Sequence, residues 1–320
     1  MADLKVAVIG CGGHAQSHFR MIADEPRLHL AGLAELDDER RQKNQAQWQP
    51  DEAFADYRQM LDACRPDVVH VITMPGHLLP IVSDCLERGL HTSVEKAPGM
   101  NAVETAQMAQ AAGHSRGKAM VSFNRRYFPQ ILAVRQRVQA NGGAVHCAAT
   151  YNKPPTLLGP HAPDPLICDA IHHVDLLRWL AASGPEQAAV ATQVHGLVQD
   201  GPRDGCHRHN AVVRFDTGTF ATMMSHYGVG ARVQRAEVHG EDLSVYLDMT
   251  QGPQVEGYEK GEALALCDEE IEAVGGAGFN EVVHFTDCIL NDRTPWSTLD
   301  DAVHTMQLCE AIRSGHQGAL

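Results

Sequence analysis

Residues 6–15 of the chain read Val6-Ala7-Val8-Ile9-Gly10-Cys11-Gly12-Gly13-His14-Ala15. An apolar run rich in β-branched residues leads here into the pattern G-x-G-x-x-A, and residues 16–23 continue with the character of a helix. Gly10 can adopt backbone angles that a side chain forbids. Gly12 lets the backbone approach a pyrophosphate, and the small Ala15 lets the helix pack closely on the strand. The helix N-terminus presents N–H groups to phosphates, so the stretch predicts a dinucleotide-binding turn, although glycines also mark ordinary turns.

Size and charge limit the classes of protein to which the chain can belong. Its 320 residues are enough for two domains, and 44% of them are hydrophobic, so each domain can bury a core. The formal net charge is −14 and no long basic run occurs, which argues against a nucleic-acid or anionic-membrane partner. No apolar run approaches the ~20 residues that span a bilayer, and the first expected strand begins too early to leave room for a signal peptide.

The nine cysteines are scattered, with no C-x-x-C pair. An odd number cannot pair fully within one chain, so we expect reduced thiols and a cytoplasmic location. The cluster Cys206-His207-Arg208-His209 offers three possible metal ligands. A closed metal site needs a further ligand group elsewhere, and we predict no metal.

Strand-like runs alternate with helix-like segments as far as residue 122. The expected strands after the first are 28–34, 68–72, 91–94 and 119–121, and the clearest helices are 57–63, 78–88 and 101–115. This alternation predicts a doubly wound parallel sheet in a first domain, 1–122. Ligands of such sheets bind beyond the carboxyl ends of the strands. Gly10, Glu35, Thr73 and Lys96 all follow strands, so we expect them at that edge.

Glu35 lies about 20 residues beyond the glycine turn, where an acidic residue meets the adenosine ribose hydroxyls. A carboxylate there favours NAD over NADP, because it would repel a 2′-phosphate. The alternative is a solvated acidic residue at the end of a strand.

The pattern changes at residue 123, where we place the start of a second domain, 123–320. After a junction at 123–129 we expect a helix to about residue 139, a strand at 144–151, a loop rich in Pro and Gly at 153–165, and an apolar helix at 166–180. Strand-like runs then dominate, at 188–198, 211–215, 220–227, 234–239 and 243–249, before helices at 279–290 and 299–314. The runs predict a mostly antiparallel sheet, so the fold class is α/β throughout.

Several motifs together resemble the Gfo/Idh/MocA oxidoreductases, named for glucose–fructose oxidoreductase and inositol dehydrogenase. They are the glycine turn, Thr73-Met74-Pro75, Glu95-Lys96-Ala97-Pro98, Phe123-Asn124-Arg125-Arg126, the run Asp169-Ala170-Ile171-His172-His173-Val174-Asp175-Leu176-Leu177-Arg178-Trp179-Leu180, and the closing helix from Gly278-Phe279. The long run, with Tyr151-Asn152-Lys153 before its loop, is most similar to the virulence-factor MviM-like members.

The resemblance implies an N-terminal Rossmann domain and a C-terminal α/β domain with a large open sheet. It implies a nicotinamide-dependent oxidation of a hydroxyl on a sugar or cyclitol, or the reverse reaction, with Lys96 and His172 beside the reacting carbon and Asp169 next to the histidine. The open sheet face commonly pairs with another subunit in this family, so we expect a homodimer or homotetramer. The cofactor contacts that we predict are Gly10, Gly12, Gly13, His14, Ala15, Glu35, Thr73, Met74, Pro75, Glu95, Lys96 and Asn124.

The chain departs from the family pattern at two places. Leu79 stands where many members carry a histidine, and Asp169 precedes His172 by three residues rather than the four of inositol-dehydrogenase-like members. We therefore do not transfer inositol as the substrate.

The expected chemistry needs a base within hydrogen-bond reach of the reacting hydroxyl. His172 suits this role by its unperturbed pKa, Asp169 is expected one turn earlier on the same helix face, and Lys96 would stabilise a developing alkoxide. The alternatives are a structural Lys96 paired with Glu95 and a His172 satisfied within the core.

Arg125, Lys153 and His173 are candidate substrate contacts, the first two for an anionic group. Surface or interdomain salt bridges are the alternative for Arg125 and Lys153, and a structural role is the alternative for His173. Asp175 is expected to make a structural hydrogen bond. Other functions compatible with these residues are reduction of another carbonyl, imine or conjugated substrate, and a non-catalytic NAD-binding sensor.

Overall fold

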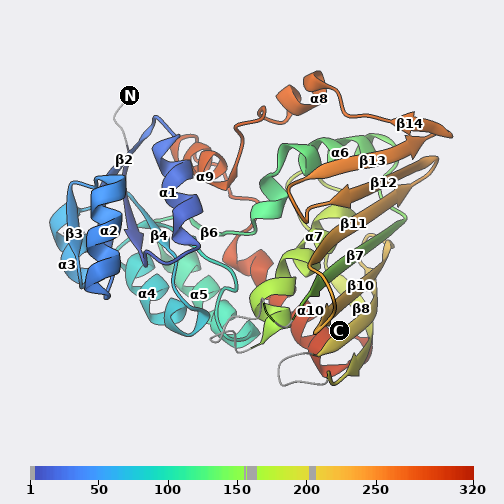
Figure 1. Cartoon of the computed structure of the whole chain (residues 1–320), viewed down its shortest axis with the longest axis horizontal. Helices are drawn as coiled ribbons and strands as arrows, with labels where there is room; N and C mark the ends of the chain where they lie inside the picture. The colour runs from blue at the N-terminus through green and yellow to red at the C-terminus, as the bar shows by residue number, and fades with distance from the viewer. Residues whose placement is uncertain (1–3, 155, 157–163, 202–206) are drawn as a thin grey trace. The chain divides into compact units, whose positions relative to one another are not determined.

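The computed structural model describes residues 4–154, 156, 164–201 and 207–320 (Figure 1). Contacts between residues divide the chain into two compact units. The first takes in residues 1–122 and 280–303, and the second takes in 123–279 and 304–320. Each unit is described by itself below.

A six-stranded parallel sheet forms the centre of the first unit, as predicted. Its spatial order is β3-β2-β1-β4-β5-β6, and every neighbouring pair is parallel. The central strands are apolar because helices cover both faces of such a sheet. The strands are β1 (Leu4–Ile9), β2 (Leu28–Ala34), β3 (Glu52–Phe54), β4 (Val68–Val71), β5 (His91–Val94) and β6 (Ala119–Val121).

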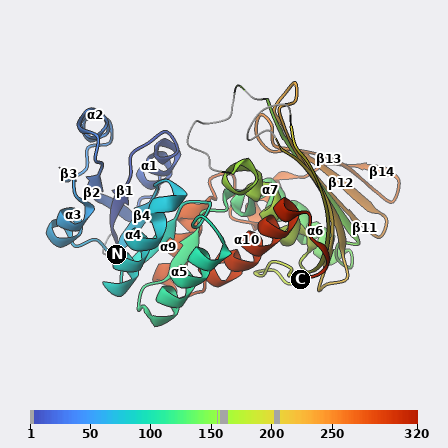
Figure 2. The same cartoon turned by 90° about the horizontal axis from the view of Figure 1, so that it is seen from below.

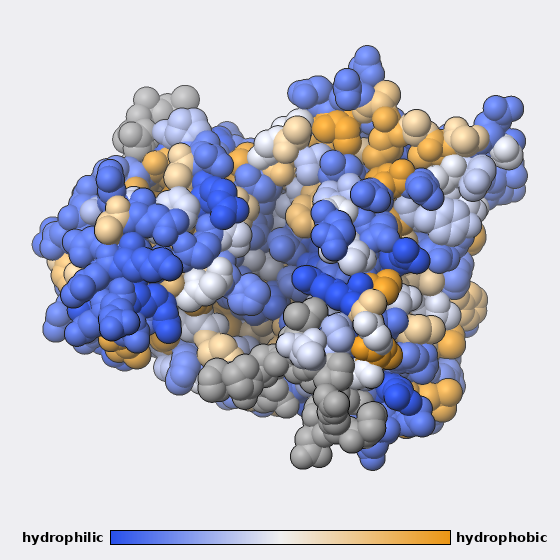
Figure 3. Space-filling model, viewed as in Figure 1, coloured by the Kyte–Doolittle hydropathy of each residue, from blue (hydrophilic) through white to orange (hydrophobic). Residues whose placement is uncertain are grey.

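Helices follow the strands in turn, and their starts are set by local capping. The side chains of Asp37, Asp56 and Asn101 accept backbone N–H groups at the N-termini of α2, α3 and α5. The face of this unit seen in Figure 3 is mostly hydrophilic over α2, whose only buried side chain is Asn44. The helices are α1 (Ala15–Ala23), α2 (Asp38–Trp48), α3 (Tyr57–Cys64), α4 (Pro75–Glu87), α5 (Ala102–His114) and α9 (Glu281–Leu290).

Residues 280–303 complete the first unit from the far end of the chain. Helix α9 contacts α1, and Ser297 exchanges two hydrogen bonds with Val121 of β6, Val121 N–H to the Ser297 carbonyl at 2.7 Å and Ser297 Oγ to the Val121 carbonyl at 2.6 Å. The sequence pattern does not reveal this return, because the pairing partners are 176 residues apart.

A nine-stranded sheet dominates the second unit, in the order β14-β13-β12-β11-β7-β10-β9-β8-β15. All neighbouring pairs are antiparallel except β7 and β10, which run parallel. Figure 2 shows α6 and α7 on one face, while the described residues place no helix on the other. The strands are β7 (His146–Lys153), β8 (Ala191–Gln199), β9 (Arg208–Phe215), β10 (Phe220–Tyr227), β11 (Val233–Gly240), β12 (Leu243–Asp248), β13 (Gln254–Glu259), β14 (Glu262–Leu264) and β15 (Gln317–Ala319).

The helix predicted at 166–180 consists of two different parts. Residues Leu166–Ala170 form a π-helical turn, η3, and the α-helix α7 spans Ile171–Ala181. Asp169 therefore lies in the π turn, and the expected α-helical spacing between Asp169 and His172 does not apply. Single π turns are frequent at functional sites. The other helices are η1 (Asn124–Tyr127), α6 (Pro129–Ala140), α8 (Asp268–Ala273) and α10 (Leu299–Ser314), the last of which spans the boundary at residue 303.

A buried ion pair anchors α7 to the junction after β6. Asp175 accepts hydrogen bonds from Arg126 Nε at 2.7 Å and from Thr305 Oγ1 at 2.9 Å. Both charged side chains are buried. This is the structural role that the sequence predicted for Asp175.

Candidate active site

The carboxyl ends of four parallel strands meet at one edge of the first unit. Gly10 N–H donates to the Ala34 carbonyl at 2.9 Å, which places the turn after β1 beside the end of β2. Ile72 N–H donates to the Ile9 carbonyl, and Glu95 N–H donates to the Val71 carbonyl. The topology thus gathers the segments that contain Gly10, Glu35, Thr73 and Lys96, as the sequence predicted.

The glycine turn has one crowded position and two open ones. Gly10 has a φ of +89°, and a Cβ on it would lie 2.3 Å from the Ile72 carbonyl oxygen, so only glycine fits. A Cβ on Gly12 or Gly13 would meet no atom within 4 Å. Among the described residues, the N–H groups of Gly12 and Gly13 have no hydrogen-bond acceptor. This open backbone before the N-terminus of α1 fits the pyrophosphate of a dinucleotide.

The two residues that follow the turn occupy different environments. His14 is exposed at the N-cap of α1, whereas Ala15 is fully buried as the first residue of the helix. The buried alanine agrees with its expected role in helix–strand packing.

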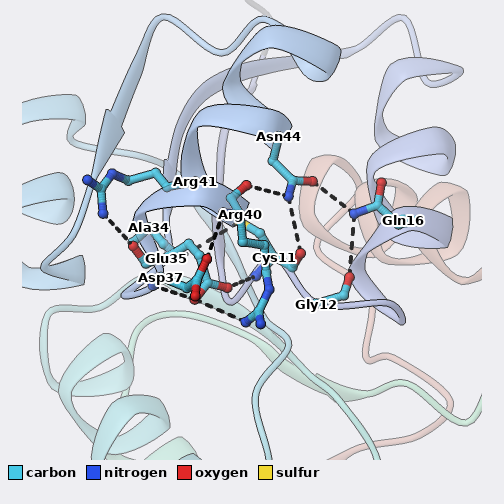
Figure 4. A network of polar contacts seen from close by, with 9 residues as sticks. All are labelled: Cys11, Gly12, Gln16, Ala34, Glu35, Asp37, Arg40, Arg41 and Asn44. Atoms are coloured by element: carbon cyan, nitrogen blue, oxygen red, sulfur yellow. Dashed lines mark hydrogen bonds and ion pairs between the residues drawn. The ribbon is translucent and has the colours of Figure 1, made fainter.

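Glu35 is fixed at the end of β2 by three donors (Figure 4). Its carboxylate accepts the backbone N–H of Cys11 at 2.9 Å and of Asp37 at 3.0 Å, and Arg40 Nη1 lies 3.4 Å from Oε1. The bond to Cys11 ties the acidic side chain directly to the glycine turn. A carboxylate can accept about four hydrogen bonds, so Glu35 keeps capacity for ribose hydroxyls.

A second set of contacts holds the turn from the side of α2, and the sequence interpretation missed it. Asn44 Nδ2 donates to the Cys11 carbonyl at 3.3 Å, and Gln16 Nε2 donates to Asn44 Oδ1 at 2.8 Å and to the Gly12 carbonyl at 3.4 Å (Figure 4). Trp48 Nε1 donates to Gln16 Oε1. These bonds engage the carbonyls of the turn. The available signal was a single asparagine on a helix of mostly charged residues and glutamines, which does not specify its partner.

The thiol of Cys11 is part of this packed region. It is 1% exposed, and burial, followed by the charge of Glu35, raises its pKa to about 12. A thiol with so high a pKa is a poor nucleophile. The structure therefore does not support a reactive thiol at Cys11, and the residue fits there by its small size.

The loop after β4 presents one predicted residue and buries another. Met74 is exposed at the N-cap of α4, Pro75 is buried at its first position, and Thr73 is half-buried. The helix therefore begins at Pro75 rather than at the predicted Leu78, because proline is favoured at the first helical position.

Glu95 and Lys96 end β5, and the Lys96–Ala97 peptide bond is cis. The Glu95 carboxylate points into the interior of the unit, where its Oε2 lies 3.2 Å from His18 Nε2. Glu281 Oε1 lies 3.9 Å from the same nitrogen, and Ser122 Oγ donates to Glu281 at 2.8 Å. Glu95 thus belongs to a buried ionic cluster within the first unit. The neighbouring Lys96 is also largely buried, with 9% of its surface exposed.

Opposite pKa shifts accompany this cluster. Burial opposes the charged form of His18, but its hydrogen bond to Glu95 and the charges of both carboxylates outweigh this and raise its pKa. His18 lowers the pKa of Glu95 against the opposing effect of burial, while burial raises the pKa of Glu281. The shifts therefore favour the charged forms of His18 and Glu95 and the neutral form of Glu281.

The second unit holds the other predicted reacting and substrate-contacting residues. Lys153 Nζ at the end of β7 forms an ion pair with Asp169 Oδ2 at 2.7 Å, so these two are brought together. His172 is half-buried at the start of α7, while its neighbour His173 is fully buried against the ring of Tyr151 with a centroid separation of 5.1 Å. Burial lowers the pKa of His173 well below its ordinary value, so this imidazole is neutral.

The residues of η1 also belong to the second unit. Asn124 is half-buried and its Oδ1 accepts Arg125 Nη1 at 3.0 Å, and Arg125 Nη2 donates to Gln234 Oε1 at 2.6 Å. Arg232 directly precedes β11, and Gln234 is the second residue of that strand. The sequence did not predict either as a site residue, because no motif marks them.

Two further predictions concern metals and membranes. Cys206 lies outside the described residues, and His207 Nδ1 lies 3.1 Å from Asp200 Oδ1. Within the described ranges, no three His, Cys, Asp or Glu side chains are grouped in a way that could hold a metal ion.

Over the same ranges, none of the helices combines the length and the apolar character needed to cross a membrane.

Two family models match the chain. An oxidoreductase family model with an NAD-binding Rossmann fold matches residues 4–123, and the model of the C-terminal α/β domain of the same family matches residues 161–318. The chain belongs to the Gfo/Idh/MocA oxidoreductase family. Membership confirms the predicted fold class, the oxidoreductase class of enzyme and the NAD cofactor of the Gfo/Idh/MocA proteins. Similarity to the MviM-like subgroup stays a prediction.

Individual relatives are distant but cover the whole chain. YceM of Salmonella typhimurium, provisionally named as an oxidoreductase, is 23% identical over 98% of both chains. The UDP-N-acetylglucosamine 3-dehydrogenase GnnA from Acidithiobacillus ferrooxidans has a TM-score of 0.82 at 19% identity, over 99% of this chain and 98% of its own. The WlbA dehydrogenase from Chromobacterium violaceum, solved with NADH and UDP-GlcNAcA, has a TM-score of 0.81 at 19% identity, over 100% and 96%. These structures share the fold of this Gfo/Idh/MocA member.

Proposed function

We propose that this oxidoreductase transfers a hydride between NAD and a hydroxyl- or carbonyl-bearing carbon of a sugar- or cyclitol-like substrate. The observation that carries the proposal is the edge of the parallel sheet, where the open glycine turn, Glu35 and Lys96 lie together. NAD, when bound, accepts or returns the hydride. Two structural relatives support the substrate class, since GnnA is a UDP-N-acetylglucosamine 3-dehydrogenase and WlbA was solved with UDP-GlcNAcA.

The residues of the chain supply position and charge to this reaction. Lys96 stabilises negative charge on the reacting oxygen, and His172 accepts the hydroxyl proton. Asp169 precedes His172 by three residues and pairs with Lys153, and this ion pair offers both a donor and an acceptor to further hydroxyls. We therefore assign Asp169 to substrate positioning through Lys153, and not to holding the imidazole of His172.

A substrate panel tests the proposal. Polyols, hexoses and amino sugars are incubated with NAD, and their keto forms with NADH, while NADH absorbance is followed. We expect turnover with at least one member and a loss of about 10²–10⁴-fold in kcat for His172→Ala. Full activity of the histidine variant would exclude it as the base. Binding of NADH with no turnover of any alcohol, carbonyl or imine would favour the sensor alternative.

Cofactor preference depends on Glu35. We predict that the wild type binds NADH more tightly than NADPH, and that Glu35→Ser reverses or removes the preference by about tenfold or more, because Arg40 is then free to pair with a 2′-phosphate. Fluorescence titration measures both affinities. Arg41→Gln is the matched control, since Arg41 donates to the Glu35 backbone carbonyl and not to its carboxylate. A wild type that prefers NADPH would contradict the role of Glu35.

We also propose that the uncovered face of the nine-stranded sheet joins two copies of the chain. Apolar side chains project from this face on several neighbouring strands, among them Val212, Phe220, Met224, Tyr246 and Tyr258. Exposed apolar side chains on β9, β10, β12 and β13 of one sheet are a feature of interaction sites, which supports the expected homodimer or homotetramer.

A further inference from the structure

Three cationic side chains of the second unit gather around Tyr151. Arg232 is exposed and hydrogen-bonds to Tyr151, and Arg125 interacts electrostatically with both of them. Lys153 follows Tyr151 by two residues on the same strand. This concentration of positive charge contrasts with the formal net charge of −14 on the whole chain.

The carboxylates near these cations do not balance their charge. Asp169 pairs with Lys153, and Asp175 is held by Arg126. Within the described residues, neither Arg125 nor Arg232 forms an ion pair with a carboxylate. Residues 154–163 contain no acidic side chain that could add one. Within the described residues, two positive charges are therefore left without a carboxylate ion pair.

Arg125 shows this imbalance most clearly, because it is only 8% exposed. Its two hydrogen bonds within the described part of the chain go to the neutral amide oxygens of Asn124 and Gln234. Burial is the main cause that lowers the pKa of Arg125 to about 10. A buried guanidinium without a carboxylate is costly, so a nearby anion would stabilise it strongly.

The unused hydrogen-bonding groups of the cluster include two donors. Arg125 Nε and Gln234 Nε2 are buried and have no acceptor among the described residues. Gln234 of β11 is the direct neighbour of Tyr151 of β7 in the sheet register. N–H donors need acceptor oxygens, which a carboxylate or a phosphate supplies in a planar or branched array.

We propose that this cluster is a subsite for an anionic group of the substrate, a carboxylate or a phosphate on a sugar, which contacts Arg232 and Lys153 directly. Arg125 is more deeply buried than these two side chains and attracts the anion by its positive charge. The inference rests on the proposed function for the sugar-like body of the ligand. It narrows the substrate class from neutral polyols to acidic sugars.

Calorimetric titration of the full-length, NADH-loaded protein tests the subsite without requiring turnover. The ligands are glucose, glucuronate and glucose 6-phosphate, together with the corresponding galactose series. We expect at least one acidic member of a series to bind about tenfold or more tightly than its neutral member. The preference should weaken as potassium chloride rises, because salt screens charge pairs. The ratio between uronate and phosphate distinguishes the two anions.

Three variants assign the effect to the cluster. Arg232→Gln should remove most of the acidic preference, and Arg232→Lys should retain it. Arg235→Gln is the matched control, because Arg235 is an exposed arginine three residues further along the chain, on β11, and pairs with Asp248. It should leave the preference unchanged.

The outcomes separate this inference from the proposed function. Equal binding of acidic and neutral sugars, no binding of any acidic sugar, or a full preference in Arg232→Gln would overturn the subsite. If neutral sugars are turned over with no acidic preference, the proposed function stands and the subsite fails. If acidic sugars bind selectively but no NADH-linked turnover occurs with any of them, the subsite stands and the proposed function fails.

Discussion

Gly10 and Gly12 are two residues apart, yet the structure gives them different tasks. Gly10 adopts a φ of +89° against the Ile72 carbonyl, whereas a Cβ on Gly12 would meet open space. We therefore expect the first glycine to serve folding, and the second to serve a ligand that approaches the backbone.

Alanine substitutions separate the two tasks. Gly10→Ala should lower the free energy of unfolding by more than about 2 kcal/mol, because φ and the close carbonyl both oppose a side chain. Gly12→Ala should change it by less than about 1 kcal/mol while weakening NADH affinity about tenfold or more. Urea denaturation and fluorescence titration measure these quantities. A stable Gly10→Ala protein, or a Gly12→Ala protein with wild-type affinity, would contradict this assignment.

At the scale of elements, the uncovered face of the nine-stranded sheet leads to a prediction about assembly. Phe220 on β10 is 50% exposed and lies on this face. Phe220→Glu should shift the protein from oligomer to monomer in light scattering, because it places a charge in an apolar interface. Val103→Glu on α5 of the first unit is the control, since Val103 is equally apolar and also exposed. A wild-type protein that is monomeric at micromolar concentration would refute the interface.

Elements with a strong apolar pattern were predictable from the sequence. The strands β2, β5, β6 and β10 begin and end where the pattern placed them. In the first unit, the alternation of strands with helices predicted a parallel sheet. The parallel strands place the glycine turn, Glu35 and Lys96 at one edge of that sheet. Parallel strands make this possible because their carboxyl ends must lie on the same side.

Short polar elements were not predictable for a physical reason. The strands β13 and β14 carry the sequences Gln-Val-Glu-Gly-Tyr-Glu and Glu-Ala-Leu, and they form because β12 offers an edge to β13 and β13 offers one to β14. The π turn at Asp169 could not be predicted either, because its residues are equally compatible with an α-helix. The charge balance around Arg125 depends on Gln234 and Arg232, which are more than 100 residues away in the chain.

At the scale of the whole molecule, buried histidines make stability depend on pH. Burial lowers the pKa of His70 and of His284 from an ordinary value of 6.5 to about 3, and it lowers that of His173 well below 6.5. These imidazoles stay neutral in the folded state but gain a proton when unfolded. Their contribution is therefore complete above pH 6.5 and is lost as pH falls toward the folded values. His18, with a raised pKa, acts in the opposite direction.

We predict that the free energy of unfolding falls as the pH is lowered from about 7 to about 5. Each of these three imidazoles contributes about 1 kcal/mol per pH unit to the fall, and His18 reduces the total because it acts in the opposite direction. His70→Leu should reduce the slope by about one proton equivalent. His29→Asn should not change it, because His29 is half-exposed beside Asp51. Urea denaturation at several pH values checks both, and an unchanged slope in His70→Leu would contradict the account.

We propose that Lys96, at the strand edge that we assign to NAD, takes part in hydride transfer. Steady-state NADH formation by the wild type and by Lys96→Met tests it most directly, once the panel has identified a substrate. We predict a loss of about 10³-fold or more in kcat for Lys96→Met, with NADH affinity within about threefold of the wild type. Wild-type turnover in Lys96→Met would contradict the claim.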